Sequence, residues 1–285
     1  MDSWRFRALT PGTPGTMPGA VDFQLQGKRA LVSGSTAGIG FAIARALAAE
    51  GASVILNGRT EQRTAAAVAA IRDGGLPDAE LRGIAADLGT AEGCAKLVQA
   101  APEIDILVNN VGIFEAKPFG EISDAEWLHF FEVNVLSGVR LSRAYLPGML
   151  ARNWGRILFI SSESALQIPV EMIQYGTTKT AQLAVARGLA EMTVGTAVTV
   201  NCILPGPTKS EGVADFVTGL AAQQGKSAGD VERDFFKHAR PSSLLQRFES
   251  PDEIAALTAF IASPRASGVN GAALRVDGGV VRAIG

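Results

Sequence analysis

Residues 28–50 read KRALVSGSTAGIGFAIARALAAE and combine a short apolar run, a glycine-rich turn and a helix-forming segment. The run KRALVSG predicts a strand, and residues 39–50 predict a helix because their apolar positions recur at intervals of three and four. The glycines allow a tight turn that brings backbone N–H groups close to an anion at the start of the helix. The stretch therefore predicts a strand–turn–helix unit that binds a pyrophosphate, although its glycine spacing differs from the commoner G-x-G-x-x-G pattern.

The same alternation of short apolar runs and helical patterns continues to the end of the chain. The strand candidates are KRALVSG, ASVILNG, LRGIAAD, IDILVNN, GRILFIS, AVTVNCIL and AALRVDG, and helical patterns cover residues 39–50, 60–72, 90–101, 123–151, 175–193 and 251–263. Strands separated by helices require crossover connections and therefore a parallel sheet. The sequence predicts an α/β Rossmann fold in one domain over residues 21–285, with a seven-stranded doubly wound parallel sheet and helices on both faces.

Composition narrows the possible partners and the environment. The 285 residues carry a net charge of −2, and the basic residues are scattered, which argues against nucleic acid or a membrane as partner. Cys94 and Cys202 have no paired spacing, so we expect two buried, reduced thiols and no metal site. No segment has the length and apolarity of a membrane span or a signal peptide, and we expect a cytoplasmic protein. Residues 1–20 are rich in Pro, Gly and Thr, which is typical of a disordered leader, and Met17 is an alternative start to Met1.

The connection over residues 208–246 interrupts the rhythm of strands and helices. A compact domain seldom keeps so long a connection without a role, and a substrate lid is the usual one. Its sequence contains two helical patterns, SEGVADFVTGLAAQQ and DVERDFFKHA. Apolar side chains such as Phe235 and Phe236 either cover a substrate or pack the lid onto the body.

The end of the second predicted strand bears on the choice between NAD and NADP. An acidic residue there would bind the ribose hydroxyls of NAD, whereas an arginine can pair with the 2′-phosphate of NADP. The strand ends in Asn57-Gly58-Arg59-Thr60, and the first carboxylate is Glu61. Arg59 therefore favours NADP(H), with NAD(H) as the alternative.

Several motifs in a fixed order resemble those of the short-chain dehydrogenase/reductase family, and the resemblance covers nearly all of residues 22–285. Ser33-Gly34-x-x-x-Gly38-Ile39-Gly40 is similar to its T-G-x-x-x-G-x-G loop, and Asn109-Asn110-Val111-Gly112 is similar to its N-N-A-G motif. The resemblance also includes a Y-x-x-x-K pair and a serine thirteen residues before the tyrosine. It implies that the catalytic residues are Ser162, Tyr175, Lys179 and Asn134. It further implies a cofactor site formed by Gly34, Ser35, Thr36, Gly38, Ile39, Gly40, Arg59, Asp87, Asn110, Gly112, Tyr175, Lys179, Pro205, Gly206 and Ser210.

These residue types suit proton transfer to a carbonyl. A free phenol has a pKa near ~10, and we expect the ammonium of Lys179, one helical turn from Tyr175, to lower the pKa of the phenol. Tyr175 then donates a proton to a carbonyl or accepts one from an alcohol, while Ser162 holds the same oxygen. The resemblance implies that Lys179 also binds the nicotinamide ribose and that Asn134 places a water.

Sequence alone leaves alternatives open at several of these residues. Ser161 competes with Ser162, and Thr208 competes with Ser210, while Asn134 and Asn110 could serve only the fold. Gln167, Glu163 and Gln174 could hydrogen-bond a polar substrate.

The function predicted is an NADP-dependent reductase or dehydrogenase acting on a small carbonyl or secondary alcohol, similar to the 3-oxoacyl-carrier-protein reductases. The alternatives are an NAD-dependent sugar or polyol dehydrogenase and a dinucleotide sensor without turnover. The resemblance also implies a homotetramer built through residues 123–151, residues 175–193 and the C-terminal strand.

Overall fold

The computed structural model describes residues 22–210, residue 213 and residues 226–284. The predicted leader, with Met17, lies outside the described residues, and so does nearly all of the first helical pattern of the lid. The disorder of the leader and the choice of start residue therefore stay predictions.

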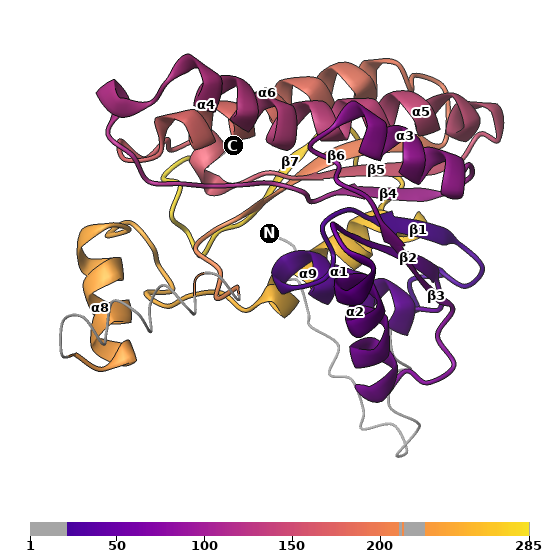
Figure 1. The fold of residues 1–285 in the computed structure, drawn as a ribbon, viewed down its shortest axis with the longest axis horizontal. Coiled ribbons are helices and arrows are strands. Elements are labelled where there is room, and N and C mark those ends of the chain that lie inside the picture. The colour runs from indigo at the N-terminus through magenta and orange to yellow at the C-terminus, as the bar shows by residue number, and fades with distance from the viewer. Residues whose placement is uncertain (1–21, 211–212, 214–225, 285) are drawn as a thin grey trace, which may run out of the picture.

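All seven predicted strands are present and form one parallel sheet, in the order β3-β2-β1-β4-β5-β6-β7 (Figure 1). They are β1 Arg29–Val32, β2 Ser53–Gly58, β3 Leu81–Ala85, β4 Ile106–Asn109, β5 Gly155–Ile160, β6 Val198–Pro205 and β7 Ala273–Val276. The chain passes from β3 back across β1 to β4, so the strand order reverses between β1 and β4. Ligands of open α/β sheets bind beyond the carboxyl ends of the strands at such a reversal. The predicted fold class is confirmed.

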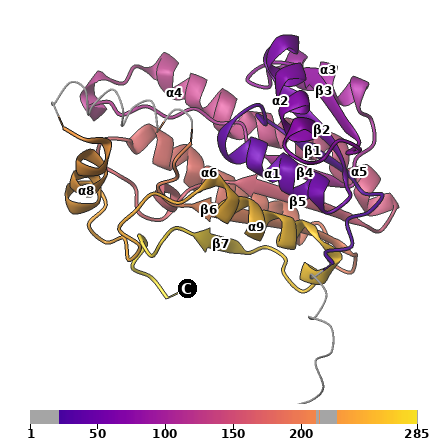
Figure 2. The ribbon, with the colours of Figure 1, turned by 90° about the horizontal axis from the view of Figure 1, so that it is seen from below.

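Helices cover both faces of the sheet, as predicted. One face carries α1 Gly38–Ala49, α2 Glu61–Asp73 and α9 Pro251–Ala262, and Figure 2 shows α1 beside α9. The other face carries α3 Ala91–Ala100, α5 Ser137–Ala151 and α6 Ile173–Glu191. Each face buries its own aliphatic core, which is consistent with strands that read as continuous Val, Ile and Leu runs.

The predicted long helix over residues 123–151 is divided by a π-helical turn. Helix α4 (Asp124–Phe131) begins at a capping box between Ser123 and Glu126, and the π turn Glu132–Leu136 leads directly into α5. Such turns inside α-helices are frequent at functional sites. Asn134, a predicted catalytic residue, lies in the middle of this turn.

The second helical pattern of the lid forms α8 (Ala228–His238), which Figure 1 shows apart from the two helical layers. Its aromatic rings pack on one another: the ring centroids of Phe235 and Phe236 lie 5.0 and 5.1 Å from that of Phe248. Phe236 is only 1% exposed. These two phenylalanines therefore pack in a small cluster of their own, separate from the two cores on the sheet, and not onto the body as the second predicted role had it.

The prediction of two buried thiols is confirmed, because Cys94 and Cys202 are both free and buried. None of the helices within the described residues is long and apolar enough to cross a membrane.

Candidate active site

The glycine-rich turn after β1 has a backbone path that requires glycine. Gly34 and Gly38 have φ angles of +60° and +57°, in the left-handed region that residues with a side chain seldom adopt. At Gly40 a Cβ would lie 2.4 Å from Nδ2 of Asn110 and 2.5 Å from the carbonyl oxygen of Gly34. The turn is thus closed against its neighbours and leaves its outer backbone accessible.

The start of α1 suits a phosphate group. Helices α2, α3, α4 and α9 begin with a Thr or Ser whose side chain accepts a backbone N–H, whereas the N-cap of α1 is Ala37, which has no side chain to do so. The first turn of α1, all of it described, also contains no acidic residue. Free N–H groups and the positive end of the helix dipole favour an anion at this point. The residues present therefore fit the pyrophosphate of a dinucleotide.

Asn110 and Ser33 lock this turn to the neighbouring strand. The Ser33 hydroxyl accepts the backbone N–H groups of Asn110 (2.8 Å) and Val111 (3.1 Å). In return, Nδ2 of Asn110 donates to the carbonyl oxygens of Ser33 and Gly34, both at 3.0 Å. Asn110 therefore shapes the glycine turn. The sequence left open a contact with the cofactor or a role only in the fold, and these hydrogen bonds give Asn110 a role in the fold.

Asn57 is a site residue that the sequence interpretation missed. It is 1% exposed, and its Oδ1 accepts the Gly34 N–H at 3.2 Å while Nδ2 donates to the carbonyls of Ile84 and Ala86. It thereby fixes the glycine turn to β2 and β3. The available signal was a polar side chain at the end of an apolar strand.

The residues predicted to contact the adenosine half lie at the ends of β2 and β3. Arg59 follows β2 and is exposed, as is Asp87 two residues after β3. Oδ1 of Asp87 accepts the N–H of Gly89 at 3.0 Å. Thr36 lies against Gly58, where a Cβ would be 2.5 Å from the Thr36 methyl group. The loop after β1 and the end of β2 are therefore in contact.

Pro205 and Gly206 end β6, and a buried carboxyl group supports them. A Cβ on Gly206 would lie 2.7 Å from Cα of Asp277, so this turn also packs too tightly for a side chain. Glu249, which is 3% exposed, accepts the Gly206 N–H at 3.1 Å. Burial raises the pKa of Glu249 to about 7.

Ser210 and Thr208, the two candidates for the residue near the carboxamide, differ in their surroundings. The Thr208 hydroxyl donates to the Gly206 carbonyl at 2.9 Å and is buried. Cβ of Ser210 lies 3.3 Å from where a Cβ on Gly38 would stand. Ser210 is thus next to the glycine turn, which favours it over Thr208 as a residue facing the cofactor.

Tyr175 and Lys179 lie on one face of α6, and Ser162 joins them from the end of β5. Nζ of Lys179 is 5.6 Å from the centroid of the Tyr175 ring and donates to the Ile160 carbonyl at 2.9 Å. The Ser162 side chain lies beside the phenol of Tyr175 and lowers its pKa. A Cβ on Gly112 would lie 3.4 Å from Nζ of Lys179, so the loop after β4 closes this cluster.

Asn134 is tied to the same helix. Its Nδ2 donates to the Thr178 hydroxyl at 2.9 Å and to the Ile113 carbonyl at 3.0 Å, and its Oδ1 accepts the Ile113 N–H at 2.7 Å. The Asn134 carbonyl accepts Nε2 of Gln182, whose Oε1 in turn accepts from Lys179 at 3.5 Å. The π turn therefore brings Asn134 into the hydrogen-bond network of Lys179.

The expected lowering of the Tyr175 pKa was wrong for the protein without cofactor. Burial raises the pKa of Tyr175 to about 12, and the hydrogen bond with Ser162 opposes this only in part. Burial also lowers the pKa of Lys179 to about 8. Desolvation disfavours the charged form of both groups, and the sequence interpretation counted only the attraction between them.

The neighbouring serines have separate partners. The Ser161 hydroxyl donates to the Lys179 carbonyl at 2.9 Å, whereas the Ser162 hydroxyl donates to Oε2 of Glu163 at 2.7 Å. Ser161 thus holds α6 by its hydrogen bond to the Lys179 carbonyl, and Ser162 is the serine beside the Tyr175 phenol. The predicted role of the Ser162 hydroxyl is to hold the substrate oxygen, whereas its hydrogen in the structure points to Glu163.

The polar residues predicted near the substrate also have protein partners. Nε2 of Gln174 donates to the Glu115 carbonyl at 3.0 Å, and Nε2 of Gln167 donates to the Ser242 hydroxyl at 3.4 Å. Phe114 is 58% exposed and its ring meets Tyr175 edge-on, with centroids 6.3 Å apart. The open side of the tyrosine therefore has an aromatic neighbour as well as polar ones.

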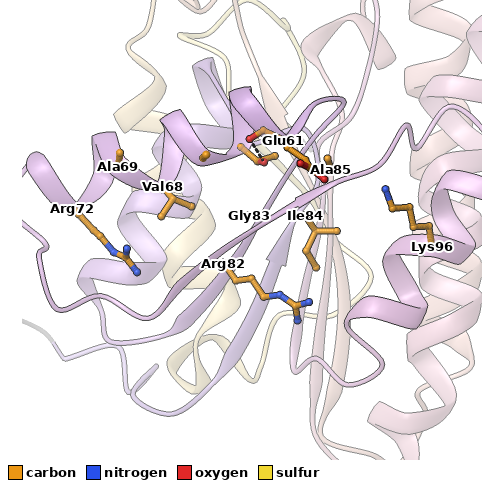
Figure 3. A pocket seen from close by; sticks show the side chains of 11 residues that line it. Glu61, Val68, Ala69, Arg72, Arg82, Gly83, Ile84, Ala85 and Lys96 are labelled. Carbon is orange, nitrogen blue, oxygen red and sulfur yellow. Dashed lines mark hydrogen bonds between the residues drawn. The ribbon is translucent and has the colours of Figure 1, made fainter.

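A surface hollow elsewhere on the sheet does not belong to this site. Its lining comes from α2, β3 and α3, and Figure 3 shows Arg72, Arg82 and Lys96 around it. Arg82 already donates to the Ala100 carbonyl at 3.0 Å. The hollow shares no residue with the predicted cofactor or catalytic sets.

Comparison with known proteins identifies the family. The family model described as short chain dehydrogenase matches residues 28–220. The chain is a member of the short-chain dehydrogenase/reductase family. As such it is an oxidoreductase, and the predicted resemblance is confirmed.

Relatives of this short-chain dehydrogenase match over nearly its whole length. The uncharacterized oxidoreductase YvaG of Bacillus subtilis (strain 168) is 50% identical over 260 residues, covering 91% of this chain and 98% of YvaG. The 3-oxoacyl-acyl-carrier-protein reductase FabG of Aquifex aeolicus is 31% identical over 264 residues, covering 91% and 100%. The crystal structure of L-sorbose reductase from Gluconobacter frateurii, complexed with NADPH and L-sorbose, has a TM-score of 0.86 at 30% identity and covers 93% and 100%.

Proposed function

We propose that this short-chain dehydrogenase transfers a hydride between NADP(H) and a carbonyl/secondary-alcohol pair, with Tyr175 as general acid and base. The observation that carries the proposal is the cluster at the end of β5. There the Lys179 ammonium lies 5.6 Å from the Tyr175 ring, and the Ser162 side chain lowers the pKa of the Tyr175 phenol. Reduction of a carbonyl requires a proton donor, here the Tyr175 phenol, and a nearby positive charge, here the Lys179 ammonium.

Each residue has a distinct part in this chemistry. The nicotinamide, when bound, supplies or accepts the hydride. Tyr175 gives its proton to the carbonyl oxygen in reduction and takes one from the alcohol in oxidation. Lys179 holds the nicotinamide ribose and stabilises the phenolate that remains, and Ser162 keeps the phenol in position. Asn134 orients a water that returns the proton from solvent.

The cofactor is held along the carboxyl ends of the strands. The glycine turn and the free N–H groups of α1 bind the pyrophosphate, and Gly112, Gly206 and Ser210 line the nicotinamide half. Arg59 pairs with the 2′-phosphate, which favours NADP(H) over NAD(H). Two observations support this: Arg59 is exposed directly after β2, and the related L-sorbose reductase was solved with NADPH.

Two substrate classes have support. The resemblance to FabG favours a 3-oxoacyl thioester, and the exposed Phe114 beside Tyr175 would suit its chain. The likeness to L-sorbose reductase favours a sugar or polyol, and Gln167 supplies a polar group nearby.

A cofactor-oxidation screen tests the proposal directly. Purified protein is mixed with NADPH or NADH and with 3-oxoacyl thioesters, ketoses or cyclic ketones, and absorbance at the nicotinamide band is followed. We expect turnover with one class and faster reaction with NADPH. Tight NADPH binding without turnover across all three classes would instead support a dinucleotide sensor.

The proposed assembly is a homotetramer formed through α4–α5, α6 and β7. Leu128 on α4 is 72% exposed and Met192 after α6 is 62% exposed, and burial of such side chains would favour association. Light scattering at micromolar concentration tests this, and a monomer would overturn it.

A further inference from the structure

Glu163 is a buried acid that stands between the catalytic serine and the lid segment. It follows Ser162 directly and is 3% exposed. Its Oε2 accepts the hydroxyls of Ser162 (2.7 Å) and Ser164 (2.5 Å), and its Oε1 accepts Nε of Arg240 at 2.9 Å. A carboxylate in such a place is costly to bury unless it is fully paired, and here both of its oxygens are paired.

The hydrogen bonds fix which way the Ser162 hydroxyl points. A serine hydroxyl has one hydrogen, and that of Ser162 goes to Glu163. The Ser162 oxygen meanwhile accepts the Ser164 N–H at 3.1 Å. Glu163 thus takes the one hydrogen that Ser162 could otherwise donate to the phenol of Tyr175 or to a substrate oxygen.

Arg240 joins this series of hydrogen bonds from the lid segment, which is residues 208–246. It lies just after α8, its side chain is 11% exposed, and its guanidinium also approaches Glu171 at 3.5 Å. The Phe235 ring lies below it, 5.9 Å from the guanidinium carbon. Arg240 is therefore held by the aromatic cluster of the lid segment and delivers its charge to Glu163.

We propose that Glu163 is a positioning residue that sets the hydrogen-bond direction of Ser162 and the charge around Tyr175, and that Arg240 couples this setting to the lid segment. The proposal rests on the proposed role of Tyr175 as acid and base. The charged and titratable groups facing this tyrosine are Lys179 on α6, with Cys202 of β6 near its ammonium, and the Glu163–Arg240–Glu171 chain.

The two partners act on Tyr175 with opposite signs. The Glu163 carboxylate raises the pKa of the phenol and the Arg240 guanidinium lowers it. Removing the carboxylate should therefore favour the phenolate, and removing the guanidinium should disfavour it. A role confined to folding would not produce two shifts of opposite sign.

The test is the pH profile of alcohol oxidation, measured as kcat/KM on the substrate found by the screen. Glu163→Gln should move the acid limb to lower pH by roughly one pH unit, and Arg240→Met should move it to higher pH by a similar amount. In the double variant Glu163→Gln/Arg240→Met, the two shifts should largely cancel, because the lost carboxylate and the lost guanidinium act on Tyr175 with opposite signs. Arg233→Met, which removes an exposed arginine from the same helix, is the matched control and should leave the profile unchanged.

The outcomes separate this inference from the proposed function. If the wild type turns over and the acid limb of kcat/KM lies at the wild-type pH in both single variants, the coupling is overturned and the proposed function is unaffected. No turnover by the wild type, or full turnover by Tyr175→Phe, would overturn the function itself. If Glu163→Gln does not fold because Arg240 is left buried and unpaired, the double variant restores charge balance and should fold. Its limb should then lie near that of the wild type and below that of Arg240→Met, and a limb equal to that of Arg240→Met would contradict the proposal.

Discussion

Gly40→Ala should damage both the stability of the protein and its cofactor site. The new methyl group would stand 2.4 Å from Nδ2 of Asn110 and 2.5 Å from the Gly34 carbonyl oxygen, so the amide of Asn110 must move. It would then lose its two hydrogen bonds of 3.0 Å to the glycine turn. Each is worth about 1 kcal/mol, and forced overpacking adds roughly 1–3 kcal/mol. The helix propensity of alanine returns about 1 kcal/mol, which leaves a net destabilisation of roughly 2–4 kcal/mol.

The assay combines urea denaturation, followed by far-ultraviolet circular dichroism, with fluorescence titration of NADPH. Because the turn that carries the N–H groups must shift, we expect NADPH to bind at least tenfold more weakly, a loss of about 1.4 kcal/mol. Gly188→Ala on α6 is the control: among the described residues nothing lies within 4 Å of the added methyl group. It should be neutral or stabilising. A Gly40→Ala variant with wild-type stability and wild-type NADPH affinity would refute the account of the glycine turn.

Three other substitutions test separate parts of the site. Lys179→Ala should lower kcat about a hundredfold or more and weaken NADPH binding, and steady-state kinetics with a binding titration will show whether both change; a loss in only one would contradict the dual role. Arg59→Asp should shift the NADPH/NADH ratio of kcat/KM toward NADH, and an unchanged ratio would make Arg59 an ordinary surface charge. Glu249 has a pKa raised from 4.5 to about 7 in the folded protein, so ionisation costs stability as pH rises through that window. We therefore compare the free energy of unfolding of Glu249→Gln with that of the wild type at two pH values. The difference should favour the variant more at pH 8 than at pH 5, by up to about 3 kcal/mol. Equal differences at both pH values would refute the raised pKa.

The fold followed from the sequence because each element has a strong local signal. Strands buried on both faces read as aliphatic runs, and the helices that cover them have apolar positions spaced by three and four. The proposed catalytic pair, Tyr175 and Lys179, could be predicted for the same reason, since residues four apart on a helix share a face. Asn134 was located by resemblance, but the π turn that aims it has no signature in residues 123–151.

The interactions that tune the site could not be predicted, because they join residues with no fixed spacing. Glu163 and Arg240 are 77 positions apart, and Glu249 meets Gly206 across 43 positions. The error about Tyr175 has a related cause. Spacing places Lys179 near the phenol, but the burial that raises the pKa of Tyr175 comes from the whole tertiary structure.

The central claim is that Tyr175 supplies the proton, and the chain offers a matched control because it has only two tyrosines. Tyr145 is a buried residue of α5, and its hydroxyl donates to the Ala101 carbonyl at 2.8 Å. The decisive measurement is kcat for Tyr175→Phe and Tyr145→Phe alongside NADPH affinity. We expect Tyr175→Phe to lose turnover by about a hundredfold or more with NADPH binding retained, and Tyr145→Phe to lose some stability and keep its turnover. Equal turnover by the two variants would contradict it.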